Sequence, residues 1–442
     1  MNITIVGAGY VGLVSGACFA ELGHSVRIIE ADRQKVDRVN GNQVGMFEPG
    51  LVGLLAKNLQ DNRLMATLFD PALVQSSEVI FLCVGTSGTS VDGRDDLSTN
   101  YLANACDEIA GALEGHEGDP VTIVVKSTVP PGTTRNIVMS SFSEMDFVSV
   151  AMNPEFLREG MAIEDFMNPD RIVIGADDKA ASRILEKLYA SLDAPIIVTT
   201  PETAELVKLA TNSFLACAIS FSNEMANIAE ATANVEAADL FAGLHLDKRF
   251  EGPDGRRAAI TAYLKPSSGY GGSCLPKDTL GFSDYAGAIG LESVLLTSIS
   301  TVNQGRAGHI VELLQRSCPD LQSTDIAVLG LAFKAGTDDL RHSPSLKLLE
   351  QLAPRGGRVR AYDPNIQDVD TATSIEIEVM MSVDQCLQGA RAVLILTSEP
   401  SFKTIDWGVS GIAEGAIIYD PWSVVGNAHG YEVIRLGNGP RI

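Results

Sequence analysis

The sequence predicts an α/β protein with two Rossmann-like, doubly wound domains joined by a long central helix and a helical dimerisation region. Three observations carry this prediction: a glycine-rich strand–turn–helix pattern opens the chain, a second such pattern begins after Ser323, and an uninterrupted helical pattern lies between them. The chain has 442 residues, more than one hydrophobic core usually serves. We therefore expect three domains, at residues 1–200, 201–305 and 306–442.

The first domain is predicted to bind NAD. After the β-rich run ITIV, Gly7, Gly9 and Gly12 follow in G-x-G-x-x-G spacing, and a helical pattern and a second apolar run ending at Glu30 come next. The glycines allow a tight turn and the close approach of a pyrophosphate. The Glu30 carboxylate would bind the ribose hydroxyls of adenosine and repel a 2′-phosphate, which favours NAD over NADP. A glycine turn without a ligand is the alternative.

The central segment, from about Glu202 to Ala233, contains no Pro or Gly and is apolar at helical spacing. Lys208 and Asn212 lie four residues apart on one face of it, so both side chains can reach the same site. Further strands are predicted on either side of this helix, at SSEVIFLCVGT, DPVTIVVKSTV, DIAVLGLAF, RAVLILTS and GAIIYDP.

Composition and charge exclude several classes of protein. The formal net charge of −23 would repel nucleic acid and anionic membranes over most of the surface. No stretch approaches a membrane-spanning helix, and Met1 leads directly into a strand without a charged and apolar leader, so we expect a cytoplasmic protein. Seven cysteines without a CxxC pattern argue against a disulfide framework and a zinc site, and we expect no metal.

Cys274 is the candidate nucleophile. It stands in GYGGSCLPKD, between a glycine cluster and a Lys-Asp pair. A nucleophilic thiol needs close approach by the substrate and polar groups that favour the thiolate, whereas a buried structural cysteine needs neither. An inert cysteine beside glycine is the alternative.

An ordered series of motifs resembles the UDP-glucose/GDP-mannose dehydrogenase family. The motifs are GAGYVGL, EPGL, KSTVPPGTT, NPEFLREG, PDRIVIG, AELVKLATNSFLA, GYGGSCLPKD, GLAFKAGTDDLR and AYDP. The resemblance implies a four-electron oxidation, in which the C6 alcohol of a nucleotide sugar becomes a carboxylate and two NAD are reduced. UDP-glucose is the favoured substrate, with GDP-mannose or another UDP-hexose as alternatives. A two-electron β-hydroxyacid dehydrogenase and a non-catalytic NAD-binding scaffold are the alternatives from other classes.

The resemblance also implies site residues. The catalytic group is Cys274, Lys208, Asn212, Asp278, Glu155 and Thr128. The cofactor-binding group is Gly7, Gly9, Tyr10, Val11, Gly12, Glu30, Lys35, Thr86, Thr128, Glu159, Lys277 and Arg341. The substrate-binding group is Glu155, Phe156, Leu157, Lys208, Asn212, Arg249, Tyr270, Gly271 and Lys334. Cys274 would carry the sugar as a thiohemiacetal and then as a thioester, and Glu155 would act as the base for thioester hydrolysis.

Departures from the family pattern concern the substrate. The link between LHLDKR and the glycine cluster is longer than in the simplest UDP-glucose enzymes. In the family this link usually carries an arginine that reaches the substrate of a neighbouring subunit, a role that Arg249, Arg256 or Arg257 could fill. Trp422 stands near the place where many UDP-glucose members carry an arginine, and Ser87 replaces a common proline. No histidine precedes Cys274, which argues against the N-acetylmannosamine branch and its GGHC pattern. We expect a homodimer or higher homo-oligomer with the long helix at its interface, because that helix is apolar on more than one face.

Overall fold

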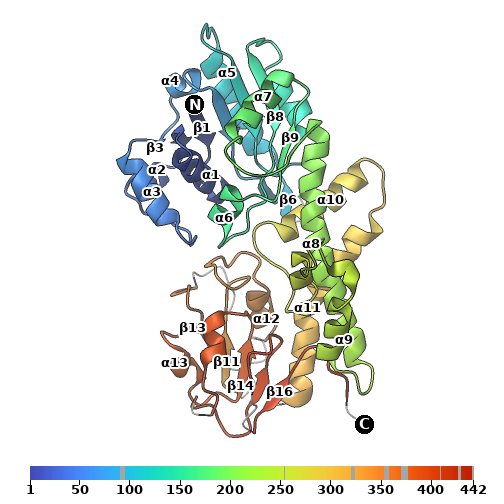
Figure 1. The fold of residues 1–442 in the computed structure, drawn as a ribbon. Helices are drawn as coiled ribbons and strands as arrows, with labels where there is room; N and C mark the ends of the chain where they lie inside the picture. Colours follow the sequence, from blue (N-terminus) through green and yellow to red (C-terminus); the bar gives the residue numbers. More distant parts are fainter. Residues whose placement is uncertain are drawn as a thin grey trace. The chain divides into compact units, whose positions relative to one another are not determined.

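The protein is described from a computed structural model, which covers residues 1–89, 95–252, 254–319, 324–352, 358–369, 377–408, 410–426 and 430–440. The chain divides into two compact units. Unit 1 comprises Met1–Thr211 and Asp284–Leu291, and unit 2 comprises Asn212–Ser283 and Glu292–Ile442. Each unit contains a sheet with helices packed on it (Figure 1).

Unit 1 is built on a sheet in which the described residues form eight strands, in the order β10-β9-β8-β7-β4-β1-β2-β3. The strands are β1 (Asn2–Val6), β2 (Ser25–Ile29), β3 (Leu64–Thr67), β4 (Val79–Leu82), β7 (Val121–Val125), β8 (Val148–Met152), β9 (Ile172–Gly175) and β10 (Ile196–Thr199). Neighbours pair in parallel, except that β8 and β9 are antiparallel. The strand order reverses beside β1, and the carboxyl end of the strands at such a point is where nucleotides bind.

Both faces of this sheet are covered, which explains why its strands are apolar throughout. On β4, Phe81 packs into a cluster with α1, whereas Ile80 and Leu82 pack into a second cluster with α5. The helices of unit 1 are α1 (Tyr10–Glu21), α2 (Arg33–Asn40), α3 (Leu51–Gln60), α4 (Pro71–Gln75), α5 (Asn100–Leu113), η1 (Thr134–Met139), α6 (Ala162–Met167) and α7 (Lys179–Leu188). A short antiparallel pair, β5 (Ser87–Thr89) and β6 (Asp95–Leu97), lies outside the large sheet.

Unit 2 contains a second parallel sheet, in which the described strands follow the order β13-β12-β11-β14-β15-β16. These strands are β11 (Ile326–Leu329), β12 (Val359–Tyr362), β13 (Glu378–Val379), β14 (Ala392–Ile395), β15 (Ile417–Tyr419) and β16 (Glu432–Ile434). Ile326 and Val328 pack with helices α11 and α12 on one face, and Ala327 and Leu329 pack with α13 on the other. The helices that begin in unit 2 are α9 (Ala237–His245), η2 (Lys248–Phe250), η3 (Ala259–Tyr263), α10 (Leu275–Ala288), α11 (Val294–Ser317), α12 (Pro344–Leu352), α13 (Val383–Leu387) and η6 (Pro400–Thr404).

The long helix α8 spans Pro201–Glu230 and begins in unit 1 and ends in unit 2. By length and composition it is the one helix among the described residues that could cross a membrane. The expectation that no stretch approaches such a helix was therefore wrong for this segment, because its many alanines and leucines outweigh its few charges. Half of its most apolar stretch is buried in the structure, and core helices of soluble proteins meet the same criterion.

The predicted fold class is confirmed: two Rossmann-like sheets and a long central helix are present. All five further strands predicted from apolar runs appear as β4, β7, β11, β14 and β15. The division into three domains at residues 1–200, 201–305 and 306–442 stays a prediction.

Candidate active site

The glycine-rich loop of unit 1 lies between β1 and α1. Gly7 has φ +107°, and a Cβ there would lie 2.6 Å from the Cys83 carbonyl oxygen. A Cβ at Gly12 would lie 1.9 Å from the Gly7 carbonyl oxygen, so this residue allows the helix to pack on the strand. At Gly9 a Cβ would meet nothing within 4 Å. The open space at Gly9, immediately before the first turn of α1, fits the pyrophosphate of a dinucleotide.

Glu30 follows β2 and reaches the same loop. Its carboxylate accepts hydrogen bonds from the Ala8 amide at 3.0 Å and from the Asp32 amide at 3.2 Å. Lys35 Nζ lies 3.9 Å from Glu30 Oε2, and its cofactor role stays a prediction. Thr86 is buried beyond the end of β4, where its carbonyl accepts from the Ser98 amide. Val11 is half-buried in the first turn of α1.

Lys208 of α8 and Glu155 form a buried ion pair within unit 1. Lys208 Nζ lies 2.8 Å from Glu155 Oε1, and both side chains are less than a tenth exposed. Burial raises the pKa of Glu155, but the Lys208 charge and hydrogen bond and the Leu157 amide outweigh that effect and leave the pKa lowered. Glu155 is therefore a carboxylate at neutral pH, the form that a general base requires.

Phe156 continues this polar site with an aromatic surface. Its ring lies 5.5 Å from Lys208 Nζ and 3.8 Å from the Arg171 guanidinium carbon. Both cations therefore face the ring at distances typical of cation–π contacts. Arg171 belongs to the PDRIVIG motif, and sequence reasoning gave it no role.

Lys126 is a second buried cation that sequence reasoning missed. It opens the KSTVPPGTT motif, is only 4% exposed, and donates to Asn153 Oδ1 at 3.0 Å. Burial lowers its pKa to about 8, and the charge of Lys208 acts in the same direction. A lysine directly after the buried strand β7 was the signal available in the sequence.

Two buried carboxylates hold the loops of unit 1 in place. Glu48 of the EPGL motif accepts from the Tyr10 hydroxyl, the Gly160 amide at 2.7 Å and the Ala162 amide at 2.8 Å. It thus connects the first turn of α1 to the end of the NPEFLREG motif, which contains Glu159. Glu205 of α8 accepts from the amides of residues 132 and 134, in the motif that contains the half-buried Thr128. Neither carboxylate was predicted.

Unit 2 contains a second buried polar group. Asp278 is 0% exposed and bridges two predicted site residues, because Asn212 Nδ2 donates to its Oδ2 and Lys277 Nζ to its Oδ1, each at 2.6 Å. Lys277 and Asp278 are neighbours at the start of α10, and Asn212 reaches Asp278 from α8. Asp278 therefore has both carboxylate oxygens hydrogen-bonded in the buried environment.

Cys274 lies immediately before α10 and is partly exposed. Its Sγ lies 3.4 Å from Ser273 Oγ, and its carbonyl accepts from the Asp278 amide at 2.9 Å. The first turn of a helix carries partial positive charge, which favours an anionic sulfur. Among the described residues, the cysteines at 18, 83, 106 and 386 are buried, and burial raises the pKa of each thiol.

The other predicted substrate and cofactor residues of unit 2 differ in exposure. Tyr270 is 5% exposed, and its ring packs with Ala216 and Ile299 in an apolar cluster of unit 2. Lys334 Nζ lies over the Phe333 ring. Arg341 and Arg249 are exposed and paired with the carboxylates of Asp339 and Asp247, two residues earlier in each case. Gly271, a predicted substrate contact, approaches the His342 carbonyl so closely that a Cβ would lie 2.3 Å from it.

The dinucleotide fingerprint of unit 1 is typical of an NAD-dependent dehydrogenase. Cys274, the predicted nucleophile, is partly exposed directly before α10 in unit 2. The chain belongs to the UDP-glucose/GDP-mannose dehydrogenase family. Residues 1–193 match the family's NAD binding domain, residues 202–305 its central domain and residues 327–427 its UDP binding domain.

Relatives and solved structures agree with this assignment. The chain is 38% identical over 409 residues to the UDP-glucose 6-dehydrogenase TuaD of Bacillus subtilis. The aligned region covers 92% of this chain and 85% of that protein. It is 38% identical over 417 residues to a UDP-glucose 6-dehydrogenase of Rhizobium meliloti, with 92% and 91% covered. The structure of a UDP-glucose dehydrogenase from Pyrobaculum islandicum superposes with a TM-score of 0.88 at 34% identity, over 98% of this chain and 96% of that one.

We predict that Lys126 makes the stability of the protein depend on pH. Its pKa falls from 10.5 to about 8 on folding. At pH values between about 8 and 10.5, the unfolded chain therefore binds more protons than the folded protein. The free energy of unfolding relative to a Lys126→Met variant should therefore rise with pH across that window, by about 3 kcal/mol in all.

Urea unfolding of both proteins at intervals from pH 7 to about pH 10.5 measures this difference. A constant difference between the two proteins across the window would contradict the prediction.

Proposed function

We propose that this protein oxidises UDP-glucose to UDP-glucuronate with two NAD, through a covalent intermediate on Cys274. The observation that carries this proposal is the placement of Cys274, a partly exposed thiol between the glycine-rich segment and the first turn of α10. A two-electron dehydrogenase has no use for such a thiol. Family membership, the UDP binding domain at residues 327–427 and the names of the relatives support the choice of substrate.

The first oxidation converts the C6 alcohol to an aldehyde. NAD, held by the glycine-rich loop and Glu30, would supply the hydride acceptor for both oxidations. In the protein, Lys208 supplies the buried cation, and Asn212 the amide, that stabilise negative charge on the C6 oxygen. Because Lys208 Nζ is already desolvated and held by Glu155, little reorganisation is needed when that charge develops.

The second oxidation requires a tetrahedral carbon from which hydride can leave. Addition of the Cys274 thiolate to the aldehyde forms a carbon–sulfur bond and gives a thiohemiacetal. Loss of hydride from C6 then leaves a thioester on Cys274. Asp278, with both oxygens hydrogen-bonded to Asn212 and Lys277, is proposed to hold with Thr128 the water through which protons are transferred.

Hydrolysis of the thioester completes the reaction. Glu155 is a carboxylate because Lys208 and the Leu157 amide stabilise its charge. It is proposed to take a proton from the attacking water, and the carbon–sulfur bond then breaks to release the uronate and the Cys274 thiolate. Lys334 and Arg249 are proposed to bind the nucleotide sugar, and Arg341 is proposed to bind a phosphate of the cofactor.

We also propose a homodimer, or a larger assembly of such dimers, in the cytoplasm. Phe214, Phe221 and Ile228 repeat every seven residues along α8 and are 62%, 42% and 55% exposed. Residues at this spacing lie on one face of a helix, so they form an apolar stripe. A second copy of the chain is the partner that would cover it.

We predict that the purified protein forms two NADH for each UDP-glucose consumed and uses NAD in preference to NADP. The thiohemiacetal route gives the first result, and repulsion between Glu30 and a 2′-phosphate gives the second. Absorbance at 340 nm with limiting sugar measures the ratio, with UDP-galactose, UDP-N-acetylglucosamine and GDP-mannose as alternative substrates.

One NADH per sugar would contradict the proposed reaction. A higher kcat/KM with GDP-mannose than with UDP-glucose would change the proposed substrate but not the proposed covalent mechanism. Glu30→Ala should raise the ratio of NADP to NAD use by about tenfold, equivalent to about 1.4 kcal/mol.

We predict that Phe221→Asp shifts the protein from dimer to monomer, because a carboxylate would have to be buried in the interface. Light scattering coupled to size exclusion measures the mass. Tyr101→Asp is the matched control, since Tyr101 is 62% exposed on α5 of unit 1 and is not one of the stripe residues. A stable, active monomer of the wild-type protein would rule out the dimer.

A further inference from the structure

The segment that leads to Cys274 has its own supporting side chains. The segment of residues 266–271 belongs to no helix or strand, and Ser267, Ser268 and Tyr270 are nevertheless buried. Backbone groups buried in this way need hydrogen-bond partners. In unit 2 these partners are side chains of α8 and α11 rather than a neighbouring strand.

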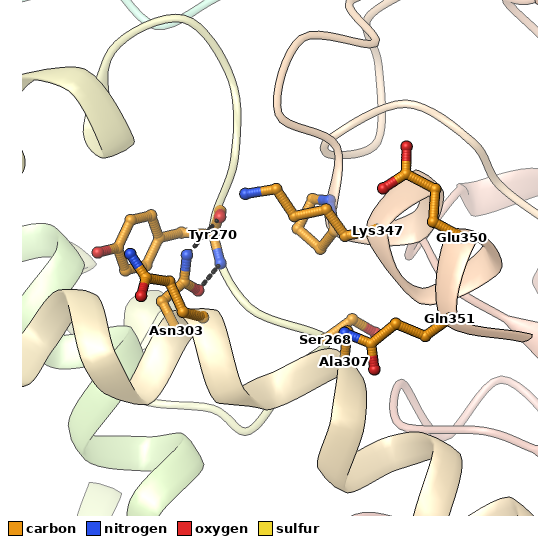
Figure 2. A pocket seen from close by; sticks show the side chains of 9 residues that line it. Ser268, Tyr270, Asn303, Ala307, Lys347, Glu350 and Gln351 are labelled. Atoms are coloured by element: carbon orange, nitrogen blue, oxygen red, sulfur yellow. Dashed lines mark hydrogen bonds between the residues drawn. The ribbon is translucent and has the colours of Figure 1, made fainter. Parts of the chain in front are cut away.

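Three side chains hold this segment at two residues. Asn223 of α8 accepts from the Ser267 amide at 2.7 Å, and Arg306 of α11 donates from Nε to the Ser267 carbonyl at 2.8 Å. Asn303 of α11 accepts from the Tyr270 amide at 2.8 Å and donates to the Tyr270 carbonyl at 3.0 Å. A single side-chain amide thus makes both bonds that a β-strand neighbour would make, as the dashed lines in Figure 2 show.

The Asn303 contact depends on a glycine. Gly269 has φ +115°, and a Cβ there would lie 2.6 Å from Asn303 Oδ1. Any other residue at 269 would therefore displace the Asn303 side chain or the backbone. The glycine cluster before Cys274 accordingly admits a supporting side chain, in addition to any room it leaves for the sugar.

The other end of the segment is fixed by the loop after β11. The Gly272 amide donates to the Arg341 carbonyl at 3.0 Å, and a Cβ at Gly272 would lie 2.8 Å from the Phe333 ring. Between this contact and α10 only two residues remain, Ser273 and Cys274. The position of the Cys274 thiol therefore follows from the register that Asn303 sets at Tyr270 and from the start of α10.

We propose that Asn303 is a positioning residue for Cys274. Its side-chain amide fixes the register of residues 266–271 at Tyr270, and the Cys274 thiolate is thereby oriented for attack on the C6 aldehyde. This inference rests on the proposed covalent role of Cys274. Asn303 touches neither substrate nor cofactor in this account. Displacing a nucleophile by about 1 Å can lower a rate about a hundredfold, which sets the scale of the effect.

A substitution at Asn303 should leave the fold intact. The residue is half-buried and lines a hollow of about 130 Å³ between α11 and α12, shown in Figure 2. Because this hollow has room for water, the Tyr270 amide and carbonyl can be hydrated when the side chain is removed. Arg306 is 1% exposed and would be a poorer choice, since its loss would leave a large buried gap.

The test compares Asn303→Ala with Gln304→Ala, its exposed neighbour on α11. We expect Asn303→Ala to lower kcat about a hundredfold, to change the KM for UDP-glucose and NAD by less than about threefold, and to slow alkylation of Cys274 by iodoacetamide about tenfold. Asn303→Asp keeps the acceptor for the Tyr270 amide and should show an intermediate defect in both rates. Gln304→Ala should match the wild type.

Equal alkylation rates and equal kcat in Asn303→Ala and Gln304→Ala would overturn the inference. So would a lower thermal midpoint of Asn303→Ala without a change in the alkylation rate of the folded variant. If Asn303→Ala does not fold, the kcat and the alkylation rate of Asn303→Asp, each compared with Gln304→Ala, test the inference instead. The alkylation rate is measured without substrate. A failure of the proposed reaction would therefore appear in the wild-type NADH ratio, and a failure of the positioning role in the variants.

Discussion

The buried ion pair between Lys208 and Glu155 is the interaction on which the arrangement of unit 1 depends. Moving an isolated charge into a protein interior costs several kcal/mol, and these two are tolerated because their atoms lie 2.8 Å apart. The pair joins α8 to the segment after β8, and so fixes which turn of the helix faces that segment. It also leaves a desolvated cation and a desolvated carboxylate in one place, which is what stabilising an oxyanion and activating a water require.

The same logic recurs in unit 2 with a different set of groups. Asp278 is fully buried, and its two oxygens are held by an amide and an ammonium group. These contacts explain how an apolar helix such as α8 can carry buried charged and amide side chains. Among its polar residues, Glu205, Lys208 and Asn212 are each buried with a hydrogen-bond partner.

Much of this fold could be predicted from the sequence, because its signals are local. The glycine spacing, the apolar runs of a covered parallel sheet and the long helical pattern each depend on neighbours in the chain. The antiparallel pairing of β8 with β9 has no local signal in the sequence. The length and apolar composition of α8 would allow it to cross a membrane, which the sequence analysis did not foresee. The predicted roles of the site residues, from Gly7 to Arg341, stay predictions.

The supporting residues could not be found in this way. Glu48 acts on amides more than 100 residues later, Lys126 on an asparagine 27 residues later, and Asn303 on a backbone 33 residues earlier. Their roles arise from tertiary proximity, which one sequence does not encode in any short pattern. Motif membership marked Glu48 and Lys126, but only the contacts show what they hold.

The covalent route is tested most directly by the mass of the enzyme during turnover. Glu155→Gln keeps the volume of the side chain and an oxygen that can accept from Lys208, but it cannot act as a base. We expect this variant, quenched in acid after mixing with UDP-glucose and NAD, to carry the mass of one UDP-glucuronyl group on the peptide that contains Cys274. Cys274→Ser, the control, should lose several orders of magnitude in turnover and carry no thioester. An unmodified Cys274 in Glu155→Gln, together with near wild-type turnover by Cys274→Ser, would contradict the covalent mechanism.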